Sequence, residues 1–266
     1  MSDSEFALQL RDLACRVARE AGEMVLACQR DELSIDTKAS DLDLVTQVDR
    51  ESEALITERL LAVRPDDGVI GEEGTGVRGS SGVDWLIDPI DGTTSFVYGL
   101  PGFSVSIAAQ FDAEVIAGVV FAPATGSEYS AARDSGARLN GDEIAVRATS
   151  SLDKALVATG FSPELSRRKR QGQLFAELIP RIRDIRRMGS AALDLAAVAA
   201  GQVDAYFEVG LSPWDYAAGA LIAEEAGAEV VIEPDEQSGR AFVAAVPRSI
   251  APEFLKMLRD LGADRV

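Results

Sequence analysis

The sequence predicts a mixed α/β or α+β fold, and two observations support that class. In the first 150 residues, stretches of helical periodicity precede a run of short strands, two of which follow each other as adjacent strands do. After residue 150, apolar strand-like stretches alternate with helical ones. A chain of 266 residues can form one large domain or two tightly packed ones. We predict two packed halves, residues 1–150 and 151–266, because no linker, repeat or disordered tract separates them.

The first half is predicted to begin with two helices. Apolar residues recur at helical spacing over residues 5–29, and a second periodic stretch, Val48–Val63, ends before Pro65. Asn140-Gly141 is a strong turn signal and predicts a polar hairpin over Gly136–Val146. Short strands are predicted near 68–71, 83–88, 103–111 and 115–121, with a turn at Asp112 between the last two.

The second half is predicted to alternate between strands and helices. Its alanine-rich residues 191–200 indicate a tightly packed, buried helix. The strands are predicted near 155–160, 183–187, 203–208, 228–232 and 241–246. The helices are predicted near 164–179, 190–201, 213–226 and 250–261. Such alternation is typical of a sheet that is covered by helices.

Composition excludes several classes of protein. Hydrophobic residues make up 47% of the chain, but no apolar run approaches the roughly 20 residues that cross a bilayer. The first residues, Met1–Glu5, lack the basic and apolar regions of a signal peptide, so we expect a cytoplasmic protein without a membrane partner. The net charge of −18 argues against nucleic acid as the main partner. The basic cluster Arg167–Arg170 is a local exception; a solvated helix face is favoured, and a phosphate-attracting rim or partner surface is the alternative.

The chain contains no histidine, which excludes phosphohistidine chemistry, a His-activated nucleophile and His-ligated zinc. Its two cysteines, Cys15 and Cys28, fall on the apolar stripe of the first helix. Buried free thiols are therefore favoured over a disulfide or a metal site.

The most informative segment is Trp85–Thr94, W-L-I-D-P-I-D-G-T-T. An apolar run brings Asp88 to a strand end, and Asp91 follows three residues later. Two carboxylates this close repel each other unless a cation lies between them. Gly92–Thr94 could start a helix whose N–H groups face an anion, so a divalent metal bridging to a phosphate would satisfy both demands. The alternative is that Asp91 caps a helix and Asp88 only ends a strand.

Three further segments place a carboxylate at the end of a predicted element. They are Asp43–Asp49, which ends in Asp49; Val69–Gly74, which contains Glu72 and Glu73; and Ser212–Asp215, whose Asp215 falls in the first turn of a helix. Hard cations such as Mg²⁺ prefer sites built from such oxygen ligands. Glu73 could instead be a solvated charge.

In this order the motifs resemble those of the inositol monophosphatases, a family of metal-dependent, lithium-sensitive phosphatases. The matching segments are Lys38-Ala39-Ser40 through Asp49, Gly71-Glu72-Glu73, Asp88–Thr94, Arg187–Ala192 and Trp214–Gly219. They span residues 38–227. One departure is Ser95, where members of the family often carry Asn; this small change is expected to alter local hydrogen bonds and not to abolish activity. The resemblance implies a layered α-β-α-β-α sandwich of the sugar-phosphatase type, with the site between the halves, and a homodimer.

The resemblance also implies a role for each site residue. Metal ligands would be Glu72, Asp88, Asp91, Asp215 and the main-chain carbonyl of Ile90, with Asp88 bridging two Mg²⁺ ions and a third, looser ion near Glu72. Thr93 and Asp49 would orient and deprotonate the attacking water, with Glu72 as a further catalytic group. Gly92 and Thr93 would face the phosphate, and Asp91, Ala191, Glu208 and Asp215 would meet the substrate hydroxyls. Glu208 could instead be a surface charge. Lys38 could neutralise nearby acids instead of contacting the substrate.

The expected activity is Mg²⁺-dependent hydrolysis of inositol monophosphate, a small phosphorylated polyol. Because the chain lacks histidine and a credible cysteine nucleophile, a metal-activated water would attack directly, without a covalent intermediate. Two alternatives remain open. The substrate could be fructose 1,6-bisphosphate, histidinol phosphate or a 3′-phosphonucleotide, or the protein could be a regulatory binding protein.

Overall fold

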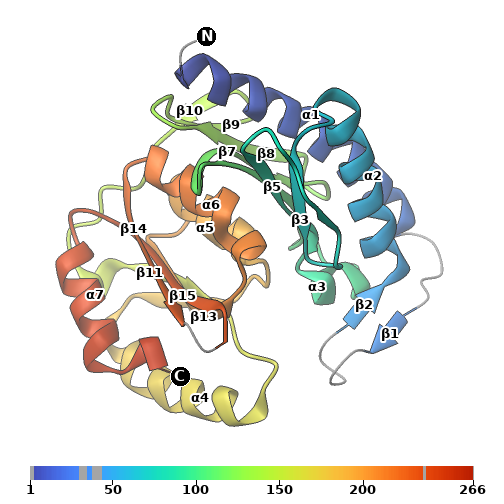
Figure 1. Cartoon of the computed structure of the whole chain (residues 1–266). Helices are drawn as coiled ribbons and strands as arrows, with labels where there is room; N and C mark the ends of the chain where they lie inside the picture. The colour runs from blue at the N-terminus through green and yellow to red at the C-terminus, as the bar shows by residue number, and fades with distance from the viewer. Residues whose placement is uncertain (1–2, 30–34, 38–43, 236–237, 266) are drawn as a thin grey trace.

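The computed structural model of the chain describes residues 3–29, 35–37, 44–235 and 238–265. Within these residues the elements stack in five layers, helix, sheet, helix, sheet, helix (Figure 1). This is the predicted layered sandwich, and the predicted fold class is confirmed. Lys38, for which the sequence left two roles open, falls outside the described residues.

The helices form the two outer layers and the middle one (Figure 1). One outer layer is α1 and α2, the middle layer is α5 and α6, and the other outer layer is α4 and α7. Their bounds are α1 Asp3–Cys28, α2 Gln47–Val63, α3 Thr93–Val97, α4 Leu165–Leu178, α5 Ala191–Ala199, α6 Pro213–Glu225 and α7 Ala251–Asp260. Short 3₁₀ turns cover Leu152–Lys154, Ile179–Arg181 and Ala263–Arg265.

The larger sheet has eight strands in the order β10-β9-β8-β7-β6-β5-β3-β4. Only β3 and β5 run parallel; the other neighbours in this sheet are antiparallel. The strands are β3 Gly68–Gly71, β4 Gly76–Val77, β5 Val83–Asp91, β6 Ser104–Phe111, β7 Glu114–Ala122, β8 Ser127–Ala132, β9 Ala137–Leu139 and β10 Asp142–Ile144. A separate pair, β1 (Ile35–Thr37) and β2 (Leu44–Thr46), precedes α2.

The smaller sheet has five strands in the order β12-β11-β13-β15-β14. Strand β11 is parallel to both of its neighbours, whereas β15 is antiparallel to β13 and β14. The strands are β11 Leu156–Thr159, β12 Asp184–Arg186, β13 Ala205–Leu211, β14 Ala228–Asp235 and β15 Arg240–Pro247. The C-terminal ends of β11 and β13 therefore meet at one edge of this sheet.

Alternation along β5 assigns its side chains to two different cores, as the pleat of a strand requires. Trp85 and Ile87 pack with Leu10 of α1 and Ile56 of α2. Leu86 belongs instead to the core around α5 and α6. The same alternation turns Asp88 toward the middle layer of helices, where the site lies.

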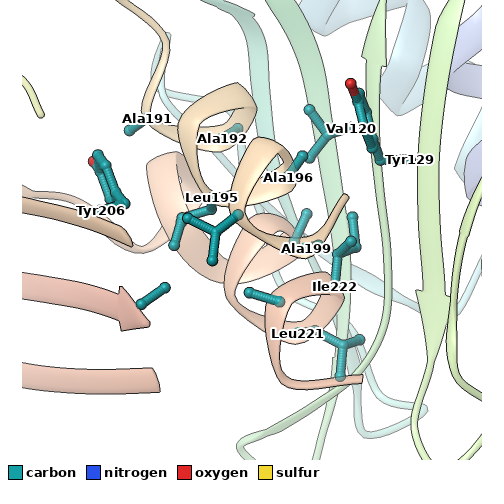
Figure 2. Packing of buried hydrophobic residues seen from close by; sticks show 14 of the residues in the cluster. Val120, Tyr129, Ala191, Ala192, Leu195, Ala196, Ala199, Tyr206, Leu221 and Ile222 are labelled. Atoms are coloured by element: carbon teal, nitrogen blue, oxygen red, sulfur yellow. The ribbon is translucent and has the colours of Figure 1, made fainter. Parts of the chain in front are cut away.

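One core cluster, around the middle helices, contains residues of both sheets. Figure 2 shows α5 and α6 side by side, with Val120 of the large sheet on one side and Tyr206 of the small sheet on the other. Leu195 of α5 and Ile222 of α6 belong to the same buried cluster. Alanines on α5 let the helices approach closely, which explains why residues 191–200 are so rich in alanine. The division at residue 150 stays a prediction.

Most predicted elements are observed within a few residues of their predicted ends. Strand β8 is the main omission, because Ser127–Ala132 is rich in small residues with low intrinsic strand preference and becomes a strand through its neighbours β7 and β9. The predicted Asn140-Gly141 hairpin is confirmed as β9–β10. Cys15 is buried and Cys28 half-buried, and neither forms a disulfide within the described residues. No helix within the described ranges combines the length and apolar character needed to cross a membrane.

Candidate active site

A cavity of about 150 Å³ lies where β5, α3, α5, β13 and α6 come together. All of the predicted site residues line it except Asp49. Asp49 is buried in the first turn of α2, and its charge still acts on Glu72 and Asp88. The predicted residues therefore come from segments far apart in the sequence and meet at one place. Their chemical roles stay predictions.

A β-bulge at the end of β5 brings Asp88 and Asp91 to the same cavity. The strand was predicted to end at Asp88 but continues to Asp91, where Asp88 pairs with Ser106 and Asp91 with Ser104. Asp88 and Asp91 are three residues apart on β5, but their partners Ser106 and Ser104 are two residues apart on β6. The extra residue on β5 makes the bulge. In a regular strand, side chains three residues apart point to opposite faces. The bulge includes Pro89, which has no N–H for the ladder.

Asp91 also stabilises the start of α5. Its Oδ2 accepts hydrogen bonds from the Ser190 hydroxyl, at 2.6 Å, and from the Ala192 N–H, at 2.7 Å. The alternative that Asp91 caps a helix is therefore partly right, but the helix is α5 and not the adjacent α3. At α3 the N-cap is Gly92, whose φ of 95° suits glycine. Asp91 links the two halves of the chain at the cavity.

Glu72 follows β3 and is held by backbone and side-chain contacts. Its N–H donates to the Ile87 carbonyl of β5 at 3.1 Å. Buried Glu53 of α2 accepts from the N–H groups of Glu73, at 2.8 Å, and Thr75, at 3.0 Å. Glu53 thereby fixes the turn that carries Glu72. Glu73 is also within 3.7 Å of Arg50, so it is a paired charge and not simply a solvated one.

Thr93 and Asp215 have fixed positions at the other walls. The Thr93 hydroxyl donates to the Ile90 carbonyl at 3.1 Å. Asp215 accepts the Ser212 N–H at 2.7 Å at the start of α6, so its carboxylate also stabilises a helix end. Asp88 accepts the Ile90 N–H at 3.1 Å. These bonds orient the acids that line the cavity.

Crowding and burial disfavour the charged form of these acids. Burial, then the charges of Glu72 and Asp91, raises the pKa of Asp88 well above its usual range. Burial raises the pKa of Asp91 to about 6, although the donors at Ser190 and Ala192 oppose this. Burial and then the charge of Asp49 raise the pKa of Glu72 to about 7. A cation among them would relieve this repulsion.

The substrate side of the cavity is formed by Ala191 and Glu208. Glu208 lies on β13, and its Oε2 accepts the Tyr206 hydroxyl at 2.9 Å. Burial raises the pKa of Glu208 to about 7, and the Tyr206 hydrogen bond opposes that shift. Glu208 is half-buried and lines the cavity, so it is not a simple surface charge.

Sequence reasoning missed three residues near the site that the pattern could have indicated. Glu53 lies four residues after Asp49, on the same helix face. Tyr206 lies two residues before Glu208, on the same strand face. Asp194 is buried in the apolar helix α5, and its Oδ1 has no hydrogen-bond partner among the described residues. Burial and the charge of Glu208 raise the pKa of Asp194 well above its usual range.

Two other sequence features lie apart from the chemistry. The basic cluster Arg167–Arg170 is on α4, and none of its side chains is among the described residues that line the cavity. Lys169 and Arg170 are exposed, as a solvated helix face requires, whereas Arg167 and Arg168 are half-buried. Ser95 is buried in α3 close to Gly189, behind the cavity wall.

In the part of the chain that the structure describes, no three acidic or cysteine side chains converge into a ready-made metal cage. The acids that line the cavity are instead engaged with protein donors, as at Asp91 and Asp215. Their chemistry nevertheless fits a hard cation, because carboxylates and a nearby carbonyl are the ligands such ions prefer and their charges repel one another.

Comparisons with known proteins agree with this architecture. The chain is 41% identical to Inositol-1-monophosphatase SuhB of Mycobacterium tuberculosis, over 94% of this chain and 93% of that protein. The solved structure of Mycobacterium tuberculosis SuhB matches with a TM-score of 0.82 over 96% of this chain and 97% of its own. The chain is also 42% identical to Nus factor SuhB of Pseudomonas aeruginosa, over 81% and 82% of the two chains. The extragenic suppressor protein suhB from Bartonella henselae matches with a TM-score of 0.88 at 32% identity, over 95% and 98% of the chains.

The relatives named inositol-1-monophosphatase, together with the five-layer sandwich, place the protein among the phosphoric monoester hydrolases. The sequence model of the inositol monophosphatase family matches residues 8–261, nearly the whole chain. The chain belongs to the inositol monophosphatase family, which confirms the resemblance seen in its motifs.

Proposed function

We propose that the protein hydrolyses inositol monophosphate to inositol and phosphate, with Mg²⁺ as its cofactor. The observation that carries the proposal is the meeting of Glu72, Asp88, Asp91 and Asp215 at one cavity. Further support comes from relatives whose names include inositol-1-monophosphatase. Inositol bears many hydroxyl groups, and Glu208 and the Ala191 backbone line the cavity where hydrogen-bond partners for them are needed.

In this proposal, Glu72, Asp88 and the Ile90 carbonyl would hold one metal ion, and Asp88, Asp91 and Asp215 would hold a second. A third, looser ion would lie near Glu72. When bound, Mg²⁺ lowers the pKa of a coordinated water and neutralises phosphate charge. The protein contributes fixed carboxylates, since hydrogen bonds already orient Asp88, Asp91 and Asp215.

The remaining residues position the reacting groups. The Thr93 hydroxyl, oriented by the Ile90 carbonyl at 3.1 Å, would hold the attacking water, and Asp49 would take up its proton. The N–H groups of Gly92 and Thr93 would face the phosphate. Asp91, Asp215, Glu208 and the Ala191 main chain would accept or donate hydrogen bonds to the substrate hydroxyls. No covalent intermediate is expected, because no histidine occurs and Cys15 is buried, with a pKa raised to about 12 by burial.

A phosphate-release assay tests the proposal. The substrates are inositol 1-phosphate, fructose 1,6-bisphosphate, histidinol phosphate and a 3′-phosphonucleotide, each with Mg²⁺ and then with a chelator. We expect inositol 1-phosphate to have the highest kcat/KM, loss of activity on chelation, inhibition by Li⁺, and little activity in Asp88→Asn. A higher kcat/KM on another substrate, or turnover that survives chelation, would contradict it.

A regulatory binding role is the second candidate, favoured by one observation: a relative at 42% identity is named Nus factor SuhB. The two roles predict different behaviour of Asp88→Asn. A purely regulatory protein would show no phosphate release in wild type, and Asp88→Asn would leave its cellular effect unchanged. An active wild type whose cellular effect is lost in Asp88→Asn would favour catalysis.

We further propose a cytoplasmic homodimer. An apolar groove beside the site is lined by Leu100, Pro101, Met188 and Leu193, and Leu100 is 54% exposed. Covering this groove with a second copy would remove apolar surface from water. Light scattering should give twice the chain mass at micromolar concentration, and Leu100→Asp should shift it toward the monomer. A monomeric wild type would rule the dimer out.

A further inference from the structure

We propose that Tyr206 and Gly160 are positioning residues, which hold the Glu208 carboxylate in one place in the cavity. This arrangement, called here the seat of Glu208, determines the preference for hydroxyl-bearing phosphate esters. The inference rests on the proposed function, in which Glu208 meets substrate hydroxyls. Neither Tyr206 nor Gly160 is assigned to touch the substrate. Both act through Glu208.

Gly160 provides the space for the carboxylate. Strands β11 and β13 are parallel neighbours with Thr159 opposite Phe207, so Gly160 lies beside Glu208 at the strand ends. A Cβ added at Gly160 would lie 2.0 Å from both carboxylate oxygens of Glu208. The φ of Gly160 is not in the left-handed region, so its backbone would accept any residue. Space, and not conformation, requires glycine here.

Tyr206 fixes the orientation of the same carboxylate. The Tyr206 ring is fully buried in the core between the sheets, so its hydroxyl has little freedom. That hydroxyl donates to Oε2 of Glu208 at 2.9 Å. Among the described residues, Oε1 of Glu208 accepts no further hydrogen bond, which leaves it for a ligand in the cavity. A held acceptor loses less side-chain entropy on binding than a free one.

The experiment compares kcat/KM for inositol 1-phosphate with kcat/KM for phenyl phosphate, which has no hydroxyl for Glu208 to meet. We expect Tyr206→Phe and Gly160→Ala each to lower the ratio about tenfold, mainly through KM for inositol 1-phosphate, the scale of one well-placed hydrogen bond to a charged group. Gly160→Ala should fold, because the three atoms nearest the added methyl all belong to the end of the Glu208 side chain, which can turn away, and none of them is backbone. Phenyl phosphate turnover should hardly change.

Matched controls separate positioning from general damage. Tyr129→Phe removes another buried hydroxyl, whose partner is Gln202 at 3.3 Å, and Gly172→Ala adds a methyl on α4 with no atom within 4 Å. Both should leave the ratio unchanged. In a Glu208→Ala background, Tyr206→Phe and Gly160→Ala should have no further effect on the ratio, because the seated group is gone.

Three results would overturn the seat. If Glu208→Ala lowers the ratio while Tyr206→Phe and Gly160→Ala do not, only the seat fails. If the losses add fully in the Glu208→Ala background, the two residues act through the fold and not through Glu208. If Glu208→Ala itself leaves the ratio unchanged, the seat and the assignment of Glu208 to substrate hydroxyls fail together.

Discussion

Within the described residues, the Thr93 side chain makes one hydrogen bond, and that bond defines its testable role. Its hydroxyl donates to the Ile90 carbonyl at 3.1 Å and faces the cavity with Asp88 and Asp91. Thr93→Ala removes a group proposed to act only while the water attacks, so kcat should fall by about 100-fold or more with KM nearly constant. Thr93→Ser, which keeps the hydroxyl, is the control and should retain most activity. If kcat falls and KM rises by similar factors in steady-state kinetics, the role of Thr93 is to start α3 and not to orient the water.

Glu53 illustrates a residue that supports the site without lining it. Its carboxylate accepts the N–H groups of Glu73 and Thr75 and occupies the space beside Gly71. Glu53→Gln replaces one acceptor oxygen by an amide NH₂ group, which cannot accept the N–H that it faces. Because one hydrogen bond is lost, the turn that carries Glu72 is held less firmly. Mg²⁺ affinity, measured by calorimetry, should therefore weaken about tenfold. Loss of a residue that orients a metal ligand costs roughly 10- to 100-fold in affinity. Glu58→Gln, an exposed change on the same helix, should leave the affinity unchanged.

At the scale of single elements, sequence patterns predicted what depends on local spacing. Helix α1, the β6–β7 pair and the Asn140-Gly141 turn follow from periodicity and turn chemistry alone. The order of motifs also indicated which acids would meet. It did not reveal the bulge after Asp88, because Pro89 reads equally well as the end of a strand. Nor did it reveal that Asp91 stabilises α5, since that contact joins residues 99 positions apart.

The raised pKa of Glu208 on β13 predicts how the stability of the protein depends on pH. Burial raises the pKa of Glu208 from 4.5 to about 7, so the native state binds more protons than the unfolded state between these values. Stability contributed by protonated Glu208 is full below about pH 4.5 and lost as the pH rises through about 7. Glu208→Gln stays neutral, so its melting temperature relative to wild type should rise between pH 4.5 and pH 8. Exposed Glu229→Gln on β14 is the control, and an equally flat difference for both variants would contradict the prediction.

The whole molecule places an acidic cavity between two sheets that share one set of helices. Residues of both halves contribute to the core around α5 and α6, as Figure 2 shows for Val120 and Tyr206. Asp91 of the first half is hydrogen-bonded to α5 of the second. Any ligand that draws Asp88, Asp91 and Asp215 together therefore binds both halves at once. Site occupancy and global stability should be coupled.

The coupling predicts a pH-dependent stabilisation by Mg²⁺. In the metal-free protein, the pKa of Asp91 is raised from 3.8 to about 6, so stability from this group falls as the pH rises through that window. Mg²⁺ binds the deprotonated carboxylates, so its effect should be small near pH 4.5 and large at pH 7.5. At a hundredfold excess over Kd, binding adds about 2.7 kcal/mol. For a chain of this size each kcal/mol corresponds to roughly 2–4 °C in Tm.

Thermal unfolding with EDTA and with Mg²⁺ at the two pH values measures this directly. Wild type should gain about 5–10 °C with Mg²⁺ at pH 7.5, by the conversion above. Asp88→Asn should gain little from Mg²⁺, because a proposed bridging ligand is missing. In EDTA at pH 7.5 the same variant should melt above wild type, since one buried charge that Glu72 and Asp91 repel is gone. A wild type whose Tm ignores Mg²⁺ at pH 7.5 would refute the metal site, whatever activity the protein shows.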